Sequence, residues 1–224
     1  MISLPQNQYM SKKSDVKNKS EEKNPISSEK NGSGKTGKVL NEILEWLEVI
    51  VAAAVIAFCI NTFLIANSVI PTSSMETTIM AGDRVMGSRL SYRFGKDPQR
   101  GDVIIFRWPV DEKTYFVKRI IGLPGETVDI HDGGVYINGS ETPLDEPYLK
   151  EAMDTPVHMT FQVPEDGYFC MGDNRNNSLD ARYWYMMARG QDNFDEKKDY
   201  TYIHRDKIIA KVLFRYWKGF KMIK

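Results

Sequence analysis

The 224-residue sequence has little of the residue types that build disulfide frameworks and metal sites. Its two cysteines, Cys59 and Cys170, lie far apart and form no CxxC pair, and its three histidines, His131, His158 and His204, are scattered. Disulfide frameworks and zinc sites need clustered cysteines and histidines. The sequence therefore predicts neither a disulfide framework nor a metal site.

The chain also lacks an excess of charge of either sign. Its 30 Lys and Arg residues balance 30 Asp and Glu residues, and the formal net charge is +0. A neutral chain has no overall field that would attract it to a nucleic-acid backbone. Zinc-finger, RNP and helix-turn-helix patterns are missing as well, so nucleic acid is not expected as a partner.

Large apolar residues are scarce in the first 39 residues, which are rich in Lys, Ser, Asn, Gly and Glu. Such a segment cannot bury enough apolar surface to fold. We expect residues 1–39 to form a disordered tail. Eight lysines precede Leu40, and the positive-inside rule therefore predicts that this tail is cytoplasmic.

A long apolar run follows the tail. Residues 49–66 contain only Asn61 and Thr62 as polar interruptions, and as a helix they would be about 27 Å long, close to the ~30 Å hydrocarbon thickness of a bilayer. A cleaved signal peptide would normally lie nearer the N-terminus, and a buried soluble helix would usually show a polar face. We expect residues 40–66 to form one transmembrane helix with a juxtamembrane turn, anchored at the interface by Trp46.

The remainder, residues 67–224, is expected to be an extracytoplasmic domain built from strands. Seven segments rich in β-branched and aromatic residues are separated by Gly, Pro and Asn, and no long helical pattern alternates with them. These segments are 101–108, 114–122, 127–130, 133–140, 159–164, 167–173 and 208–217. We predict a mainly β, antiparallel fold with a smaller β subregion at 130–170 and a surface loop at 185–201.

Three adjacent hydroxyl residues, Thr72, Ser73 and Ser74, follow the apolar run. Alone, they are typical of a linker. Lys118 is an ionisable residue placed among apolar sequence neighbours, in the segment YFVKRIIG. A lysine on a strand usually points to solvent, but burial can lower its pKa from ~10.4 toward ~7–8, where it can act as a base. Since no histidine lies in a catalytic motif, Lys118 is the candidate base for a serine nucleophile.

Four ordered blocks resemble the bacterial type I signal peptidases, also called leader peptidases, and the resemblance runs from about residue 67 to 217. Each block alone is a weak signal, whereas all four in order behind one apolar span are specific. The blocks are IPTSSMETTIMAGDRV (70–85), RGDVIIF (100–106), VKRIIGLPGE (117–126) and GDNRNNSLDAR (172–182). The resemblance implies an antiparallel β-sheet catalytic domain of the signal-peptidase type behind one N-terminal transmembrane helix.

The resemblance also implies catalytic roles. Ser74 would be the nucleophile, and Lys118 would be the general base that also activates water to hydrolyse the acyl-enzyme. Thr72, where relatives usually have serine, would stabilise the oxyanion together with the Ser74 N–H. Ser73 replaces a common glycine and is expected to take no part in the chemistry.

The last block supplies supporting residues in such proteins. Ser178 would accept a hydrogen bond from the lysine amine and orient it, and Asp180 and Arg182 would form an ion pair beneath the site. Three further residues of this block are expected to be scaffold: Asp173, Asn174 and Arg175.

The positions that match the family's pocket walls are Ile70, Phe116 and Val117. Bulky walls leave room for a small side chain, so the resemblance implies cleavage after small residues, in an Ala-X-Ala manner. For each wall residue alone, core packing explains the residue type equally well. An extended substrate would add along a strand edge.

The predicted function is that of a membrane-anchored serine endopeptidase that removes signal peptides from exported preproteins at the outer face of the cytoplasmic membrane. It would need no metal or organic cofactor. Its expected partners are preproteins and the lipid bilayer, with the secretion machinery as a further candidate.

Two alternatives come from other classes. A non-catalytic signal-peptidase-like assembly factor for surface structures would be expected to have lost the serine or the lysine, and both are present. A soluble self-cleaving repressor of the related serine/lysine type would carry an N-terminal DNA-binding module, where this chain has an apolar span.

Overall fold

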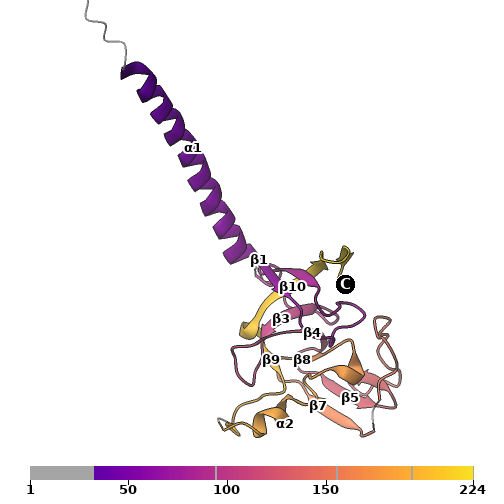
Figure 1. Cartoon of the computed structure of the whole chain (residues 1–224). Helices are drawn as coiled ribbons and strands as arrows, with labels where there is room; N and C mark the ends of the chain where they lie inside the picture. Colours follow the sequence, from indigo (N-terminus) through magenta and orange to yellow (C-terminus); the bar gives the residue numbers. More distant parts are fainter. Residues whose placement is uncertain (1–32, 94, 155, 193, 224) are drawn as a thin grey trace, which may run out of the picture. The chain divides into compact units, whose positions relative to one another are not determined.

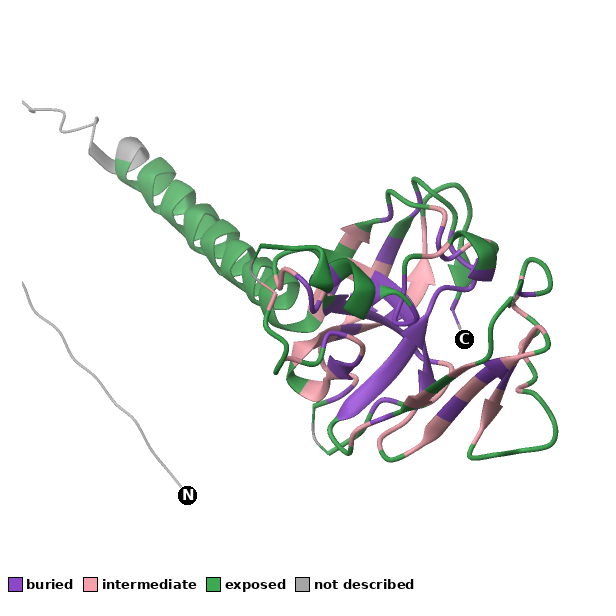
Figure 2. Ribbon diagram, turned by 90° about the horizontal axis from the view of Figure 1, so that it is seen from below, coloured by how far each residue is buried: buried purple, intermediate pink, exposed green. Residues whose placement is uncertain are grey.

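The computed structural model describes residues 33–223 except 94, 155 and 193. Helix α1 (Ser33–Cys59) continues into a π-helical turn, η1 (Ile60–Leu64), and the side chains of residues 37–64 are all exposed (Figure 2). The helix from Gly37 to Leu64 is long and apolar enough to cross a membrane. So many exposed apolar side chains are compatible with a lipid environment.

Two expected boundaries of this region are corrected. The helix begins at Ser33, so residues 33–39 are helical and not disordered, because a stable apolar helix adds further turns more easily than it begins. The expectation for residues 1–32 lies outside the described residues. At the other end the helical conformation stops at Leu64, because Ile65 and Ala66 pair with a neighbouring strand as part of β1.

The domain that follows is built on a large antiparallel sheet with strand order β1-β2-β10-β3-β4-β8-β9, and β11 pairs with β10 (Figure 1). All its pairings are antiparallel, which confirms the predicted fold class. The strands are β1 (Ile65–Val69), β2 (Arg84–Ser88), β3 (Val103–Arg107), β4 (Tyr115–Gly122), β8 (Gly167–Met171), β9 (Ile203–His204), β10 (Ile208–Arg215) and β11 (Lys221–Met222).

A second, three-stranded sheet has the order β6-β5-β7 and falls largely in the region where a smaller β subregion was expected. Its strands are β5 (Thr127–His131), β6 (Gly134–Ile137) and β7 (Met159–Gln162). Four strands of the large sheet were not predicted, namely β1, β2, β9 and β11. β9 and β11 have two residues each, and β1 and β2 lie in polar or glycine-containing stretches without the usual strand composition.

The core covers both faces of the large sheet. In β3, Ile104 and Phe106 belong to one buried cluster, and Val103 and Ile105 belong to the other. Successive side chains of a strand point to opposite faces, so both faces of β3 are buried. The neighbouring strand β4 therefore offers buried positions on each side.

A short helix corrects the expectation of a surface loop at 185–201. Helix α2 (Trp184–Arg189) has two buried residues, Trp184 and Ala188, which lie four positions apart on one helical face and pack into the larger core cluster. A six-residue helix is too short to show a periodic pattern in the sequence. In the described part of residues 190–201 no further helix or strand occurs. Two short 3₁₀ turns complete the elements, η2 (Arg175–Asn177) and η3 (Arg205–Lys207).

Candidate active site

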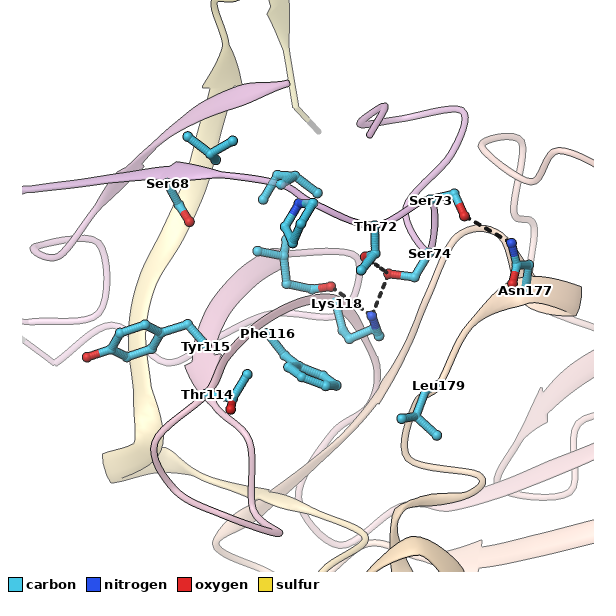
Figure 3. Close-up of a pocket in the computed structure, with 14 residues that line it drawn as sticks. Ser68, Thr72, Ser73, Ser74, Thr114, Tyr115, Phe116, Lys118, Asn177 and Leu179 are labelled. Carbon is cyan, nitrogen blue, oxygen red and sulfur yellow. Dashed lines mark hydrogen bonds between the residues drawn. The ribbon is translucent and has the colours of Figure 1, made fainter. Parts of the chain in front are cut away.

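A cavity of about 390 Å³ lies in the sheet domain, between the chain that leaves β1 and the start of β4 (Figure 3). Residues 68–74 form one side, and residues 114–118 form the other. Asn177 and Leu179 complete the lining. Three of the four sequence blocks thus contribute side chains to one cavity.

The nucleophile candidate Ser74 lies in a closed loop between β1 and β2. Ile70 N donates to Asp83 O at 2.9 Å and Gly82 N donates to Ile70 O at 2.7 Å, which closes the base of the loop. Met75 and Ile79 are fully buried and anchor its interior. The loop therefore holds Ser74 in a fixed position at the cavity.

Ser74 and Lys118 meet although 44 positions separate them in the sequence. Lys118 Nζ donates to Ser74 Oγ at 2.6 Å and to Val117 O at 3.2 Å (Figure 3). Both side chains are buried, with Ser74 8% and Lys118 3% exposed. Lys118 extends from β4, which lies between β3 and β8. A serine hydroxyl and a buried amine in direct contact have the chemistry that a nucleophile and a general base require.

Burial lowers the pKa of Lys118 to about 8, and the negative charge of Asp180 opposes this shift. Desolvation disfavours the ammonium form because water no longer surrounds it. Among the described residues, no carboxylate lies within ion-pair distance of Lys118 Nζ. An amine with this pKa is partly neutral near pH 7 and can accept the proton of a hydroxyl.

The two other hydroxyls of the cluster point to different partners. Thr72 Oγ1 lies 3.3 Å from Ser74 Oγ, so the threonine hydroxyl stays at the nucleophile. Ser73 Oγ instead accepts a hydrogen bond of 2.9 Å from Asn177 Nδ2, and Figure 3 shows this pair on the side of Ser73 away from Ser74.

Two asparagines of the last block, Asn174 and Asn177, bind Ser73 and Ser74, a role that the sequence did not reveal. Asn174 N donates to Ser74 O at 3.0 Å, and Asn174 Nδ2 donates to Ser73 O at 3.1 Å. With Asn177 on Ser73, three hydrogen bonds tie residues 73 and 74 to this loop. The block GDNRNNSLDAR drew attention to these asparagines, but it could not identify their partners, because Ser73 and Ser74 lie about 100 residues earlier in the chain.

Ser178 does not make the predicted hydrogen bond with Lys118. Its hydroxyl is buried without a hydrogen-bond partner in the described structure. It lies against Gly172, where an added Cβ would come within 2.2 Å of Ser178 Oγ and 2.5 Å of Ser74 O. The lysine amine points to Ser74 and Val117 instead. Gly172 thus provides the space in which Ser178 and the nucleophile loop approach each other.

Asp180 and Arg182 form the expected ion pair. Arg182 Nε donates to Asp180 Oδ1 at 2.8 Å, and Arg182 Nη2 donates to Asp180 Oδ2 at 2.9 Å. Asp180 Oδ2 also accepts Gly172 N at 3.0 Å, and Arg182 Nη2 donates to Arg175 O at 2.7 Å. The pair is buried and stabilises the loop that carries Gly172.

Two further buried ion pairs were missed in the sequence. Arg119 Nε and Nη2 donate to the two oxygens of Asp173 at 2.8 and 2.7 Å. Arg175 forms a second bidentate pair with Glu146, a residue between β6 and β7. The scaffold residues Asp173, Asn174 and Arg175 therefore each bind a defined partner.

The three predicted wall residues all line the cavity. Ile70 and Val117 are buried and Phe116 is half-buried. The Phe116 ring stacks on Trp108 with centroids 5.0 Å apart. No group of three or more His, Cys, Asp or Glu residues that could hold a metal ion occurs in the described part of the chain.

Comparisons with known proteins identify the family of this chain. The family model described as signal peptidase, peptidase S26, matches residues 43–217. A protein named probable signal peptidase I-2 from Synechocystis sp. is 37% identical over 77% of this chain and 73% of its own. Signal peptidase I T from Bacillus subtilis (strain 168) is 40% identical over 72% of this chain and 84% of its own.

A solved structure of a signal peptidase I from Enterococcus faecalis V583 is 31% identical, covers 52% of this chain and 97% of its own, and has a TM-score of 0.39. The assignment rests on the sequence matches, since the family model covers most of the chain, from within α1 to the residues after β10. The chain belongs to the signal peptidase family, peptidase S26.

Proposed function

We propose that this chain is a membrane-anchored serine endopeptidase that removes N-terminal signal peptides from exported preproteins. Ser74 is the nucleophile and Lys118 is the general base. The observation that carries the proposal is the 2.6 Å hydrogen bond between Lys118 Nζ and Ser74 Oγ at the end of a cavity. The names of the relatives supply the substrate class.

The reaction follows from this contact. Neutral Lys118 takes the proton of Ser74 Oγ while the oxygen attacks the scissile carbonyl, and it then gives that proton to the leaving amine of the mature protein. The signal peptide remains as an ester on Ser74. Lys118 next takes a proton from water while the water oxygen attacks the ester carbonyl. As the bond to Ser74 Oγ breaks, Lys118 gives this proton to Ser74 Oγ, which releases the signal peptide with a free carboxylate and restores the serine hydroxyl and the neutral amine.

The oxyanion of each tetrahedral intermediate is stabilised by the Ser74 N–H and the Thr72 hydroxyl. Support comes from the 3.3 Å distance between Thr72 Oγ1 and Ser74 Oγ, and from the hydrogen bonds of Asn174 that hold the Ser73 and Ser74 backbone. Thr72→Ala is expected to lower kcat on the order of 10²-fold, the usual loss for one oxyanion donor. Ser73→Ala is expected to stay within a few-fold of wild type.

The cavity walls agree with cleavage after small residues. Ile70, Phe116 and Val117 line the cavity together with Ser74, and bulky apolar walls favour a small side chain over a larger one. The segments on the two sides of the cavity are extended chain at the ends of β1 and β4. A substrate strand can hydrogen-bond between them through its main chain, in the Ala-X-Ala manner.

The span α1 gives the reaction its location. With the lysine-rich tail in the cytoplasm, the sheet domain lies outside the cytoplasmic membrane. The apolar region of a signal peptide occupies the same bilayer, which raises its effective concentration at the enzyme. Protease added to spheroplasts should digest the sheet domain and spare the tail, and the opposite pattern would overturn this topology.

The decisive experiment uses the full chain, purified in detergent, and a preprotein with Ala at the first and third positions before the cut. Ser74→Ala and Lys118→Ala are expected to lose cleavage by on the order of 10⁴-fold or more. Ser73→Ala is the matched control at the adjacent hydroxyl. Cleavage by Ser74→Ala at the wild-type rate would reject the proposed nucleophile. Failure of the wild type to cleave any preprotein would favour the non-catalytic assembly factor.

A further inference from the structure

We propose that Trp184, the first residue of α2, is a positioning residue that keeps the cavity selective for small side chains by holding Phe116 in place. The inference rests on the proposed function and deepens it, because it gives the segment 184–201 a role in substrate choice. Trp184 does not line the cavity. It acts from behind the wall.

Trp184 contacts two residues of the cavity wall. Its ring lies edge-on to the Phe116 ring, with centroids 6.3 Å apart and an interplanar angle of 69°. Its Nε1 donates to Leu179 O at 3.4 Å. Phe116 and Leu179 both line the cavity (Figure 3). One fully buried indole therefore supports both residues.

The Phe116 ring is held from a second side by Trp108. These two rings are nearly parallel, with an angle of 4° and a centroid distance of 5.0 Å. Phe106 packs against both Phe116 and Trp184, at 6.4 and 5.7 Å. A ring packed between two indoles in a dense core cannot turn aside to admit a larger group unless its neighbours move. Phe116 is therefore held rigidly in the cavity wall by Trp108 and Trp184, which do not line the cavity.

The rest of the segment ties α2 to the turn between β3 and β4. Lys198 Nζ donates to Glu112 Oε1 at 2.5 Å, and Glu112 lies in this turn. Within the segment, Phe194 packs on Tyr185 and on Tyr200, with centroids 5.8 and 5.6 Å apart. The ion pair is exposed and weak. The buried Trp184 indole therefore gives Phe116 most of its support, and the segment 185–201 holds the indole in position relative to the β3–β4 hairpin.

A shorter side chain at position 184 leaves space behind the Phe116 ring. The ring can then move back when a substrate with a larger side chain enters the cavity. Discrimination between side chains that differ by one or two methyl groups is commonly 10- to 200-fold in apolar pockets. We expect Trp184→Leu to lower the preference for alanine over valine by about tenfold.

The test measures kcat/KM of the full chain for two preproteins that differ only by Ala or Val at the residue before the cut. The ratio of the two values is compared among wild type, Trp184→Leu, Trp184→Phe and Phe169→Leu. Phe169 is also fully buried, but it packs on Phe161 and Tyr202 and does not line the cavity. It therefore controls for a general loss of packing.

The expected result is an Ala-to-Val ratio about tenfold lower in Trp184→Leu, an intermediate ratio in Trp184→Phe and an unchanged ratio in Phe169→Leu. An unchanged ratio in Trp184→Leu, or an equal fall in Phe169→Leu, would overturn the inference. If Trp184→Leu does not fold, a wild-type ratio in Trp184→Phe would do the same. Wild type that fails to cleave the alanine substrate would instead reject the proposed function, and the inference with it.

Discussion

Lys118 and Arg119 are adjacent on β4 and both are buried, but their charged groups have different surroundings. Arg119 binds Asp173 through two hydrogen bonds, donates to Gly101 O at 2.6 Å and stacks on Tyr148. Lys118 contacts a hydroxyl and a carbonyl, with no carboxylate of the described residues in ion-pair distance. One cation is neutralised by a partner, and the other is left to titrate.

The difference follows from the chemistry of the two side chains. A guanidinium stays charged at every relevant pH and must be paired when it is buried. An amine can lose its proton instead, and burial lowers the pKa of Lys118 to about 8. Because neighbouring residues of a strand face opposite sides of the sheet, β4 keeps the paired carboxylate Asp173 away from the amine. The strand thus separates a structural cation from the proposed catalytic base.

The largest effect is expected from Lys118→Arg, which replaces the titratable amine beside Ser74 with a permanently charged group. Arginine keeps the positive charge but cannot take a proton from Ser74. Cleavage is expected to fall on the order of 10⁴-fold. The measurement is single-turnover cleavage of a preprotein by the purified full chain across pH 6–10. Activity that returns at high pH would show that another group acts as the base.

The second prediction removes the ion pair between Arg119 and Asp173. Asp173→Asn leaves Arg119 charged and buried without its carboxylate, which is expected to destabilise the fold by about 3–5 kcal/mol. Chemical unfolding of the full chain measures the loss. Lys150→Met is the control, because the Lys150–Glu76 pair is 3.7 Å long with Lys150 about half exposed, and its loss is expected to cost about 0–1 kcal/mol. Equal costs for the two variants would contradict the distinction.

The third prediction concerns the stability cost of the unpaired amine. Well below pH 8 Lys118 is protonated in both the folded and the unfolded state, and the folded state bears the full penalty of burying the charge. Between the folded pKa of about 8 and the ordinary value the unfolded state binds more protons, so stability rises with pH. Lys118→Met removes the penalty and is expected to stabilise the fold by about 3 kcal/mol at pH 7, at 1.36 kcal/mol per pKa unit.

This advantage of Lys118→Met is expected to fade as pH rises through the window from about 8 toward the lysine value of 10.5. Unfolding of wild type and Lys118→Met, measured side by side at several pH values, gives the difference directly. The variant should be more stable than wild type, and it should be inactive because it lacks the proposed general base. A constant difference across this window would show that packing, and not titration, causes the effect.

The sequence was sufficient to single out Lys118 but not to predict the partner of Arg119. The β-rich segments predicted the antiparallel fold, and the resemblance of the four ordered blocks to the type I signal peptidases pointed to Ser74 and Lys118. They did so because strand composition is local and the motifs are contiguous. The pairing of Arg119 with Asp173 joins residues 54 positions apart, and no local pattern identifies the partner of a charged residue.

The same limit explains the other differences. The hydrogen bonds of Asn174 and Asn177 to the nucleophile loop span about 100 residues. The direction of the Ser178 hydroxyl depends on the space left by Gly172. The six residues of α2 are too few for a helical period, and their helix is stabilised by the burial of Trp184. Each of these features is decided by tertiary contacts.

The smallest expected effect concerns the contact between Arg119 and the ring of Tyr148. The Arg119 guanidinium lies 3.9 Å from the centre of the Tyr148 ring, and Tyr148 Oη donates to Glu146 Oε1 at 2.5 Å. Tyr148→Phe removes only the hydroxyl, whereas Tyr148→Leu also removes the aromatic face. The difference in unfolding free energy between these two variants is expected to be about 0.5–2 kcal/mol, the range of a cation–π contact. In the Arg119→Met background the guanidinium is absent, and the same pair of substitutions should differ by less. An undiminished difference there would assign the effect to packing of the ring. Asp173 would then be the main partner that stabilises the buried charge of Arg119 next to the titratable Lys118.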